Sequence, residues 1–249
     1  MPRGGGGGGG RVGRLPTALA FRVLQLADPY ASLGIAPAVL QKVSSLWSET
    51  LPFKFLTSAP KLNAVPPLAV DQAEVVLMGA SNVGKSTLLN ALLGTKLAYT
   101  SKTPGHTKML NFFQGQRHLR VVDVPGYGFG SHQHQMTLLG DYFHNRQGHA
   151  CACLLIDAKK GIKDLDLAAF SLLLEHFIPY RVLLTKADRL PVGPLRERIL
   201  ECEQTLTLSA QEFNPATSPV LVQPVSAKQR KGLDQVRASI CEMSGLLPP

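Results

Sequence analysis

Short apolar runs alternate with longer segments of helical character along residues 70–249 of this 249-residue chain. Runs of four to eight apolar, β-branched residues between turn signals are typical of buried strands. The pattern predicts strands at 74–79, 109–114, 119–124, 150–156, 180–185 and 220–225, and helices at 85–94, 135–146, 165–177, 194–212 and 233–244. Such alternation is typical of α/β proteins. We therefore expect a six-stranded, mostly parallel sheet with one antiparallel edge strand and helices on both faces.

The first 69 residues do not follow this pattern. Residues 1–27 include seven consecutive glycines, which cannot recover the entropy lost on ordering, so we expect a disordered leader. Within it, TALAFRVLQL is apolar, carries arginine and lacks acid, as a mitochondrial presequence does. A low-complexity leader without a targeting signal is the alternative. Residues 28–69 hold several prolines and one predicted helix, 38–47, and we interpret them as an adaptor or linker before a domain at 70–249.

Composition is that of a globular protein, with 45% hydrophobic and 17% charged residues. The longest apolar runs, such as 151–156, fall far short of the roughly 20 residues of a membrane span. The formal charge is +9, and four arginines in the leader leave +9 − 4 = +5 for the rest. That excess fits either RNA contact or an ordinary solvated surface. Without a CxxC pair, the four cysteines indicate reduced thiols in a protein that is not secreted.

The segment GASNVGKST lies between the first predicted strand and the first predicted helix. It fits the phosphate-binding pattern G-x-x-x-x-G-K-[ST]. The glycines let backbone N–H groups face a phosphate, Lys85 can reach its oxygens, and Ser86 offers a hydroxyl to Mg²⁺. We therefore expect a nucleotide to contact Gly79, Ala80, Ser81, Asn82, Val83, Gly84, Lys85, Ser86 and Thr87.

A second motif ends the strand at 119–124. Asp123 is followed three residues later by Gly126, so the carboxylate can hold Mg²⁺ through a water while the glycine N–H contacts a γ-phosphate. An aspartate that caps a loop would be the better interpretation if this motif stood alone. It follows a phosphate loop, which favours the nucleotide interpretation.

Two further polar clusters indicate the base. In TKAD, Asp188 can accept two hydrogen bonds from guanine that adenine cannot offer in the same geometry, and the stem of Lys186 can lie over the ring. In SAK, backbone N–H groups can meet the guanine O6. All the motifs fall at carboxyl ends of strands, where open α/β sheets bind ligands. The sequence therefore predicts a site for GTP or GDP whose base end comprises Thr185, Lys186, Asp188, Ser226, Ala227 and Lys228.

These motifs, in this order, resemble those of translation-factor-type P-loop GTPases, and more narrowly the EngB (YihA) family of ribosome-assembly GTPases, in the TrmE-Era-EngA-EngB-Septin-like class. The resemblance covers about residues 55–245 and includes SKTPGHT at 101–107, NFF at 111–113 and DVPGYG at 123–128. Thr185 stands where many GTPases have Asn, which is also similar to this family. With its arginine-bearing leader, the chain most resembles the animal mitochondrial members.

The resemblance implies a GTPase that hydrolyses GTP slowly, as a switch in assembly of the large ribosomal subunit. It implies a monomer in the mitochondrial matrix, or otherwise in the cytoplasm, whose partners are GTP or GDP, ribosomal RNA and ribosomal proteins. It favours Thr107 over Thr103 as the first-switch threonine that reaches Mg²⁺, whereas His106 departs from the expected Lys or Arg. Asn82 could hold K⁺ or only brace its loop. The catalytic candidates are Asn82, Lys85, Thr107 and Gly126.

Tyr127 stands where many hydrolytic GTPases carry a glutamine that orients water, a task that a phenol cannot perform in the same way. Catalysis would then depend on positioning and electrostatics. One rival is therefore a GTP-sensing RNA- or ribosome-binding module with incidental hydrolysis. An ATP-using phosphotransferase is a second rival, which TKAD opposes. We expect no zinc site at His132, His134, His144 and His149, and interpret Asp157, Asp164 and Asp166 as caps.

Overall fold

The computed structural model describes residues 28–31, 37–47, 53–98, 109–115, 119–128, 132–146 and 148–246. The predicted leader at 1–27 and the first-switch segment with Thr103, His106 and Thr107 lie outside the described residues. Among the described helices, none combines the length and the apolar character that crossing a membrane requires.

Seven strands form one sheet in the order β1-β3-β4-β2-β5-β6-β7. Strand β3 runs antiparallel to both of its neighbours, and all other neighbouring pairs are parallel. The α/β class and the mostly parallel sheet are therefore confirmed. The strands are β1 Lys54–Ala59, β2 Ala73–Gly79, β3 Leu110–Gln114, β4 Leu119–Asp123, β5 Ala150–Asp157, β6 Tyr180–Thr185 and β7 Val222–Pro224.

The sheet has one strand more than the sequence pattern predicted. Strand β1 lies within the segment that we interpreted as a linker, and it forms the edge beside β3, so the antiparallel strand is second from the edge. Its first three residues are exposed, and its register shifts between Phe55 and Thr57. An exposed, bulged edge strand lacks the apolar run by which buried strands are recognised. The sheet therefore begins before residue 70.

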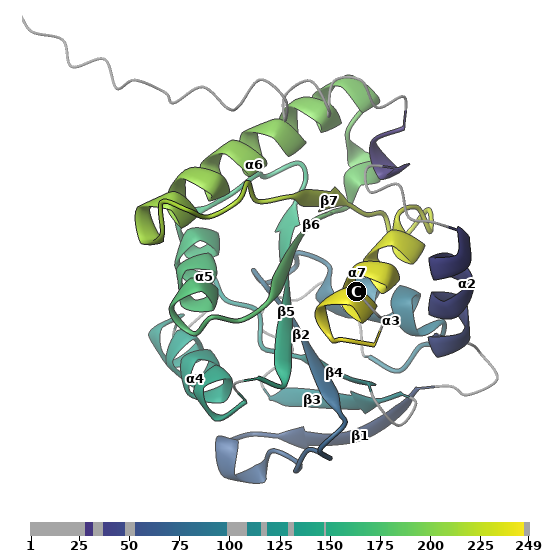
Figure 1. Cartoon of the computed structure of the whole chain (residues 1–249), viewed down its shortest axis with the longest axis vertical. Coiled ribbons are helices and arrows are strands. Elements are labelled where there is room, and N and C mark those ends of the chain that lie inside the picture. Colours follow the sequence, from purple (N-terminus) through teal and green to yellow (C-terminus); the bar gives the residue numbers. More distant parts are fainter. Residues whose placement is uncertain are drawn as a thin grey trace, which may run out of the picture.

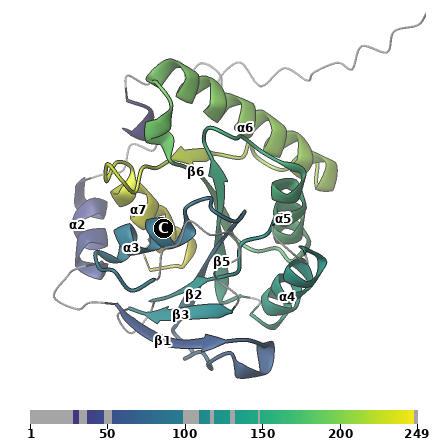
Figure 2. The same cartoon turned by 180° about the vertical axis from the view of Figure 1, so that it is seen from behind.

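Helices cover both faces of the sheet (Figures 1 and 2). One face carries α2 Pro37–Leu46, α3 Lys85–Leu93 and α7 Leu233–Met243, and the other carries α4 His132–Asn145, α5 Asp164–Glu175 and α6 Val192–Phe213. Side chains alternate along a strand. Val75 and Leu77 of β2 therefore enter the core on the face of α2, α3 and α7, whereas Val76 and Met78 enter the core on the face of α4, α5 and α6. All four cysteines are buried free thiols.

The predicted helix α2 packs against α7 rather than standing apart from the domain. Trp47, just after α2, is buried, with its ring centroid 5.4 Å from that of Phe53. Its indole N–H donates to the Cys241 sulfur at 3.4 Å, and the Arg237 guanidinium lies over the ring. The segment before residue 70 therefore contributes to the core.

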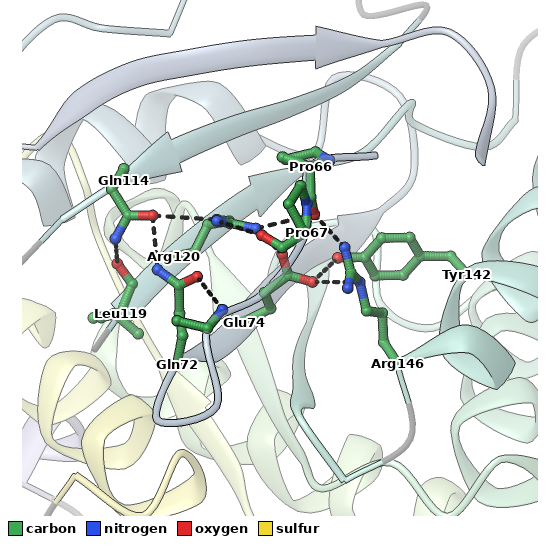
Figure 3. A network of polar contacts seen from close by, with 10 residues as sticks. Pro66, Pro67, Gln72, Glu74, Gln114, Leu119, Arg120, Tyr142 and Arg146 are labelled. Carbon is green, nitrogen blue, oxygen red and sulfur yellow. Dashed lines mark hydrogen bonds and ion pairs between the residues drawn. The ribbon is translucent and has the colours of Figure 1, made fainter. Parts of the chain in front are cut away.

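A buried ion-pair network joins the central strands near their amino ends (Figure 3). The fully buried carboxylate of Glu74 in β2 accepts a hydrogen bond from Arg120 of β4 at 2.9 Å. It pairs with Arg146, beyond α4, at 3.2 Å, and it accepts a hydrogen bond from the Tyr142 hydroxyl of α4. A buried carboxylate requires such partners, because unpaired charge is costly away from water. The network attaches the end of α4 to the sheet.

Candidate nucleotide-binding site

The GASNVGKST segment joins the end of β2 to the start of α3, as predicted. Gly79 and Gly84 have φ of 154° and 111°, a region that favours glycine. A Cβ at Gly79 would lie 2.6 Å from the carbonyl oxygen of Leu155, so the strand pairing leaves no room for a side chain. The loop thus leads directly into a helix N-terminus, the arrangement in which backbone N–H groups bind phosphate.

Lys85 is buried beneath this loop. Its ammonium donates to the carbonyl oxygens of Gly79 at 3.0 Å and Ala80 at 3.3 Å. Burial lowers the pKa of Lys85 to about 8, although the nearby Asp123 carboxylate acts in the opposite direction. The protein therefore holds a cation in a dry position next to the predicted phosphates.

Asp123 and Ser86 meet beside the loop. The Ser86 hydroxyl donates to Asp123 Oδ2 at 3.2 Å, and Oδ1 is buried without a hydrogen-bond partner in the described part of the chain. Burial raises the pKa of Asp123 to about 6, against the opposing effects of Lys85 and Ser86. A carboxylate with an unpaired oxygen next to a hydroxyl fits Mg²⁺, which keeps several waters and needs few protein ligands. The described residues include no cluster of three or more His, Cys, Asp or Glu that could hold a metal.

The loop after Asp123 contacts the phosphate loop directly. The Ser81 backbone N–H donates to the Tyr127 carbonyl at 2.7 Å, and its hydroxyl donates to the Gly126 carbonyl at 2.9 Å. A Cβ at Gly126 would lie 2.6 Å from the Lys85 ammonium and 2.9 Å from the Ser81 backbone nitrogen. Glycine at 126 is therefore what allows the two loops to meet.

The side chain of Tyr127 points into the core. It is 1% exposed, and its hydroxyl donates to Asp166 Oδ1 at 2.7 Å. Burial, together with the Asp166 carboxylate, raises the pKa of Tyr127 well above its usual range. The other oxygen of Asp166 caps α5 by accepting from the Lys163 N–H at 3.0 Å, as expected. In this position the phenol cannot orient a water for attack on a phosphate.

A pocket of about 280 Å³ opens where β6 and β7 end, and its lining includes Gly84, Thr87, Lys186, Asp188, Ala227 and Lys228. The Ser226 hydroxyl donates to Asp188 Oδ1 at 2.6 Å. The TKAD and SAK motifs, distant in sequence, are therefore adjacent. The pocket approaches the size of small ligand sites, which begin at about 300 Å³.

The side chain of Thr185 is buried against the phosphate loop. It is 3% exposed, and its hydroxyl lies 2.7 Å from the Val83 carbonyl oxygen and 3.2 Å from that of Ile156. It therefore connects the loop to β5 and β6.

The partner of Lys186 was not predicted from the sequence. Its ammonium donates to Asp157 at 2.7 Å and to the Asn82 carbonyl at 2.5 Å. Burial opposes ionisation of Asp157, but Lys186 and the N–H groups of Lys159 and Lys160 outweigh it and lower its pKa. Asp157 thus caps a turn, as expected, and also orients Lys186. The sequence feature that could have indicated Asp157 as a site residue is its position directly after the predicted strand at 150–156.

The remaining residues are Thr107 and the four histidines at which we expected no zinc site. Thr107, predicted to reach Mg²⁺, lies outside the described residues, as do the side chains of His132 and His134. His144 and His149 are exposed. The other predicted site residues, from Gly79 to Lys228, all lie at the carboxyl edge of the sheet.

A phosphate loop before α3, an acid at the end of β4 and a pocket beyond β6 and β7 define a P-loop nucleotide-binding protein. A family model described as "50S ribosome-binding GTPase" matches residues 74–186. The chain is 37% identical over 202 residues to a probable GTP-binding protein EngB of Nitrobacter winogradskyi, an alignment that covers 78% of this chain and 89% of that one. It is 36% identical over 192 residues to the Pasteurella multocida EngB, covering 75% and 89%.

Among solved structures, the chain is similar to the crystal structure of a probable GTP-binding protein EngB, with a TM-score of 0.54 and 24% identity, covering 70% of this chain and all of that one. This structural likeness supports the fold. The sequence relationships show more: the protein belongs to the EngB family of GTPases.

Proposed function

We propose that this protein hydrolyses GTP to GDP and phosphate as a conformational switch in assembly of the large ribosomal subunit. The contact between Ser81 and the carbonyls of Gly126 and Tyr127 carries the proposal. Through these hydrogen bonds, a change at the phosphate loop would reach the loop at 123–128. Loops that respond to a γ-phosphate in this way are the moving parts of GTPase switches.

Each end of the site has a distinct task. When the nucleotide binds, the Lys85 ammonium would replace its hydrogen bonds to the Gly79 and Ala80 carbonyls with hydrogen bonds to phosphate oxygens. At the other end of the site, Asp188 would accept hydrogen bonds from the base. Ser86, and Asp123 through a water, would hold Mg²⁺, with Thr107 as the expected first-switch ligand. Mg²⁺, when bound, neutralises charge on the phosphate oxygens. The unpaired Asp123 oxygen supports this assignment.

Slow intrinsic hydrolysis follows from the buried position of Tyr127, because that residue supplies no water-orienting group. Positioning and electrostatics from elsewhere must lower the barrier. For Asn82 we keep both alternatives, a K⁺ ligand and a loop brace. The hydrogen bond from Lys186 to its carbonyl supports the second without opposing the first.

The ribosomal partner is supported by the description of the matching family model, and the net charge of +5 outside the leader is compatible with it. A basic protein is attracted to RNA phosphates. We place the protein in the mitochondrial matrix because its leader carries arginine and lacks acid, and we keep the cytoplasm as the alternative. The relatives described above are bacterial.

The buried Tyr127 also favours one rival, a module that senses GTP, binds ribosomal RNA or proteins, and hydrolyses GTP only incidentally. In that case hydrolysis would have no role in the switch. A variant that binds GTP but cannot hydrolyse it would then retain full function in cells that lack the native protein.

Single-turnover GTP hydrolysis by the full chain distinguishes the two functions. Large ribosomal subunits from mitochondria should raise the rate by on the order of 10³-fold or more, as activating partners of GTPases do. Gly126→Ala should abolish this increase, because its Cβ would enter the space of Lys85 and Ser81. Replacing K⁺ by Na⁺ should lower the rate only if Asn82 holds K⁺.

Gly193→Ala is the matched control, since its Cβ would meet nothing within 4 Å, and this variant should be stimulated like the native protein. Tight GTP binding with no acceleration by either mitochondrial or bacterial subunits would contradict the switch and favour the binding module. Acceleration by bacterial subunits alone would contradict the mitochondrial assignment.

A further inference from the structure

Tyr30 belongs to a short 3-10 turn, η1 (Pro29–Ala31), 40 residues before the predicted domain boundary, yet it lies at the base end of the nucleotide site. The turn contacts both α6 and β7, beside which it is drawn in dark purple in Figure 1. The Tyr30 ring packs against Gly232, where an added Cβ would lie 3.2 Å from its Cδ1 atom. The Lys231 ammonium lies 5.7 Å from the ring centroid.

The segment that Tyr30 contacts is the one that carries the SAK motif. Ser226 and Lys231 close it into a turn by exchanging two backbone hydrogen bonds, of 3.0 and 3.1 Å. Gly232, with φ of 75°, ends the turn, and a Cβ there would lie 2.5 Å from the Pro224 carbonyl oxygen. The Tyr30 ring therefore packs on Gly232, which has no side chain and lies close to the Pro224 carbonyl oxygen.

The turn at 226–231 also orients Asp188, the predicted acceptor of hydrogen bonds from the base. The Ser226 hydroxyl donates to Asp188 at 2.6 Å and accepts from the Gln229 N–H at 3.0 Å. Ser226 is completely buried, so it has no water to replace these partners. Burial, and then the carboxylates of Asp188 and Asp28, raise the pKa of Tyr30, which agrees with its position close to Asp188.

We propose that Tyr30 is a positioning residue for guanine recognition: its ring holds the turn at 226–231 in place, so that Ser226 keeps the Asp188 carboxylate directed at the base. Tyr30 does not line the pocket and acts only through the turn. The inference deepens the proposed function and rests on it, because it takes the ligand to be a guanine nucleotide. It assigns part of the nucleotide site to a segment outside the P-loop motifs.

The test compares binding of GDP with binding of inosine diphosphate, which retains N1–H but lacks the 2-amino group that Asp188 is expected to bind. The ratio of the two affinities reports how well the carboxylate is oriented. Tyr30→Ala should weaken GDP binding about tenfold and lower the GDP preference, since one hydrogen bond to a charged group is worth roughly tenfold to a hundredfold. Tyr30→Phe keeps the ring and should behave like the native chain.

Tyr180→Ala is the control, because that ring packs on Phe170 at 5.1 Å, at the opposite end of β6 from Asp188. It should leave the GDP preference unchanged even if it lowers the melting temperature. An unchanged preference in Tyr30→Ala, whether or not both affinities fall together, overturns the positioning role. If the native full chain fails to bind GDP at all, the proposed function itself fails.

Discussion

Lys85 and Asp123 are both buried, and burial favours the neutral form of each side chain. The pKa of Lys85 is lowered to about 8, and the pKa of Asp123 is raised to about 6. Near pH 7 both groups are still mostly charged, so the protein holds a cation and an anion where burial disfavours them. Phosphates would favour the charged lysine, and Mg²⁺ would favour the carboxylate. Such shifted groups in a cleft are typical of functional sites.

Asp123→Asn should therefore stabilise the nucleotide-free protein. Because the pKa of Asp123 rises from its usual 3.8 to about 6 on folding, its ionisation lowers stability progressively between those pH values and by a constant amount above them. At pH 7 the variant should gain on the order of 1–3 kcal/mol in free energy of unfolding, and at pH 4 much less. Urea unfolding at both pH values measures this difference.

Asp234→Asn is the control for that experiment, because its side chain is 67% exposed and pairs with Arg237 of its own helix. It should change stability by less than about 1 kcal/mol at either pH. An equal gain for Asp123→Asn at both pH values, or a loss, would show that burial does not govern this carboxyl group.

At the scale of elements, the two ends of the sheet have different roles. The loops at the carboxyl edge hold the candidate site, whereas Glu74, near the amino end of β2, binds Arg120, Tyr142 and Arg146. Helix α4 follows the loop at 123–128 and is attached to the sheet at its far end by this network. We therefore expect any rearrangement on nucleotide exchange to occur between that loop and Tyr142.

Glu74→Gln should destabilise the protein by about 3–5 kcal/mol, because Arg120 and Arg146 would lose the charge that compensates their burial. Urea unfolding gives the change. Glu242→Gln removes one partner of an ion pair whose glutamate is 71% exposed, and should cost less than about 1 kcal/mol. Similar losses in the two variants would contradict the role assigned to burial. GDP affinity of folded Glu74→Gln should remain native, because the network lies away from the site.

Elements with strong local signals could be predicted from the sequence, and those defined by long-range contacts could not. Strand β2 is an apolar run that ends in a phosphate loop, so its place and role follow from neighbouring residues. Strand β1 is exposed over its first half and is recognised as a strand by its pairing with β3. Similarly, spacing placed Lys85 and Ser86, but the Lys186 to Asp157 pair depends on β5 and β6 being adjacent in the sheet.

For the molecule as a whole, the N-terminal segment belongs to the folded unit. Residues 54–59 extend the sheet, Trp47 lies in the core, and Tyr30 packs near Asp188. No motif in the sequence signals these contacts, because each joins residues far apart in the chain. Functional assays should therefore use the full chain rather than a fragment that begins at the predicted domain boundary.

We expect the carboxyl edge of the sheet to hold a guanine nucleotide through Asp188. Equilibrium binding of GDP, ADP and xanthosine diphosphate to the native chain and to Asp188→Asn tests it most directly, with Asp234→Asn as control. The native chain should prefer GDP over ADP on the order of 10⁴-fold, because a site built to hydrogen-bond one base leaves buried groups unpaired with another. Asp188→Asn should prefer xanthosine diphosphate, since its amide can donate to the xanthine O2. Equal binding of GDP and ADP by the native chain would show that Asp188 does not select guanine.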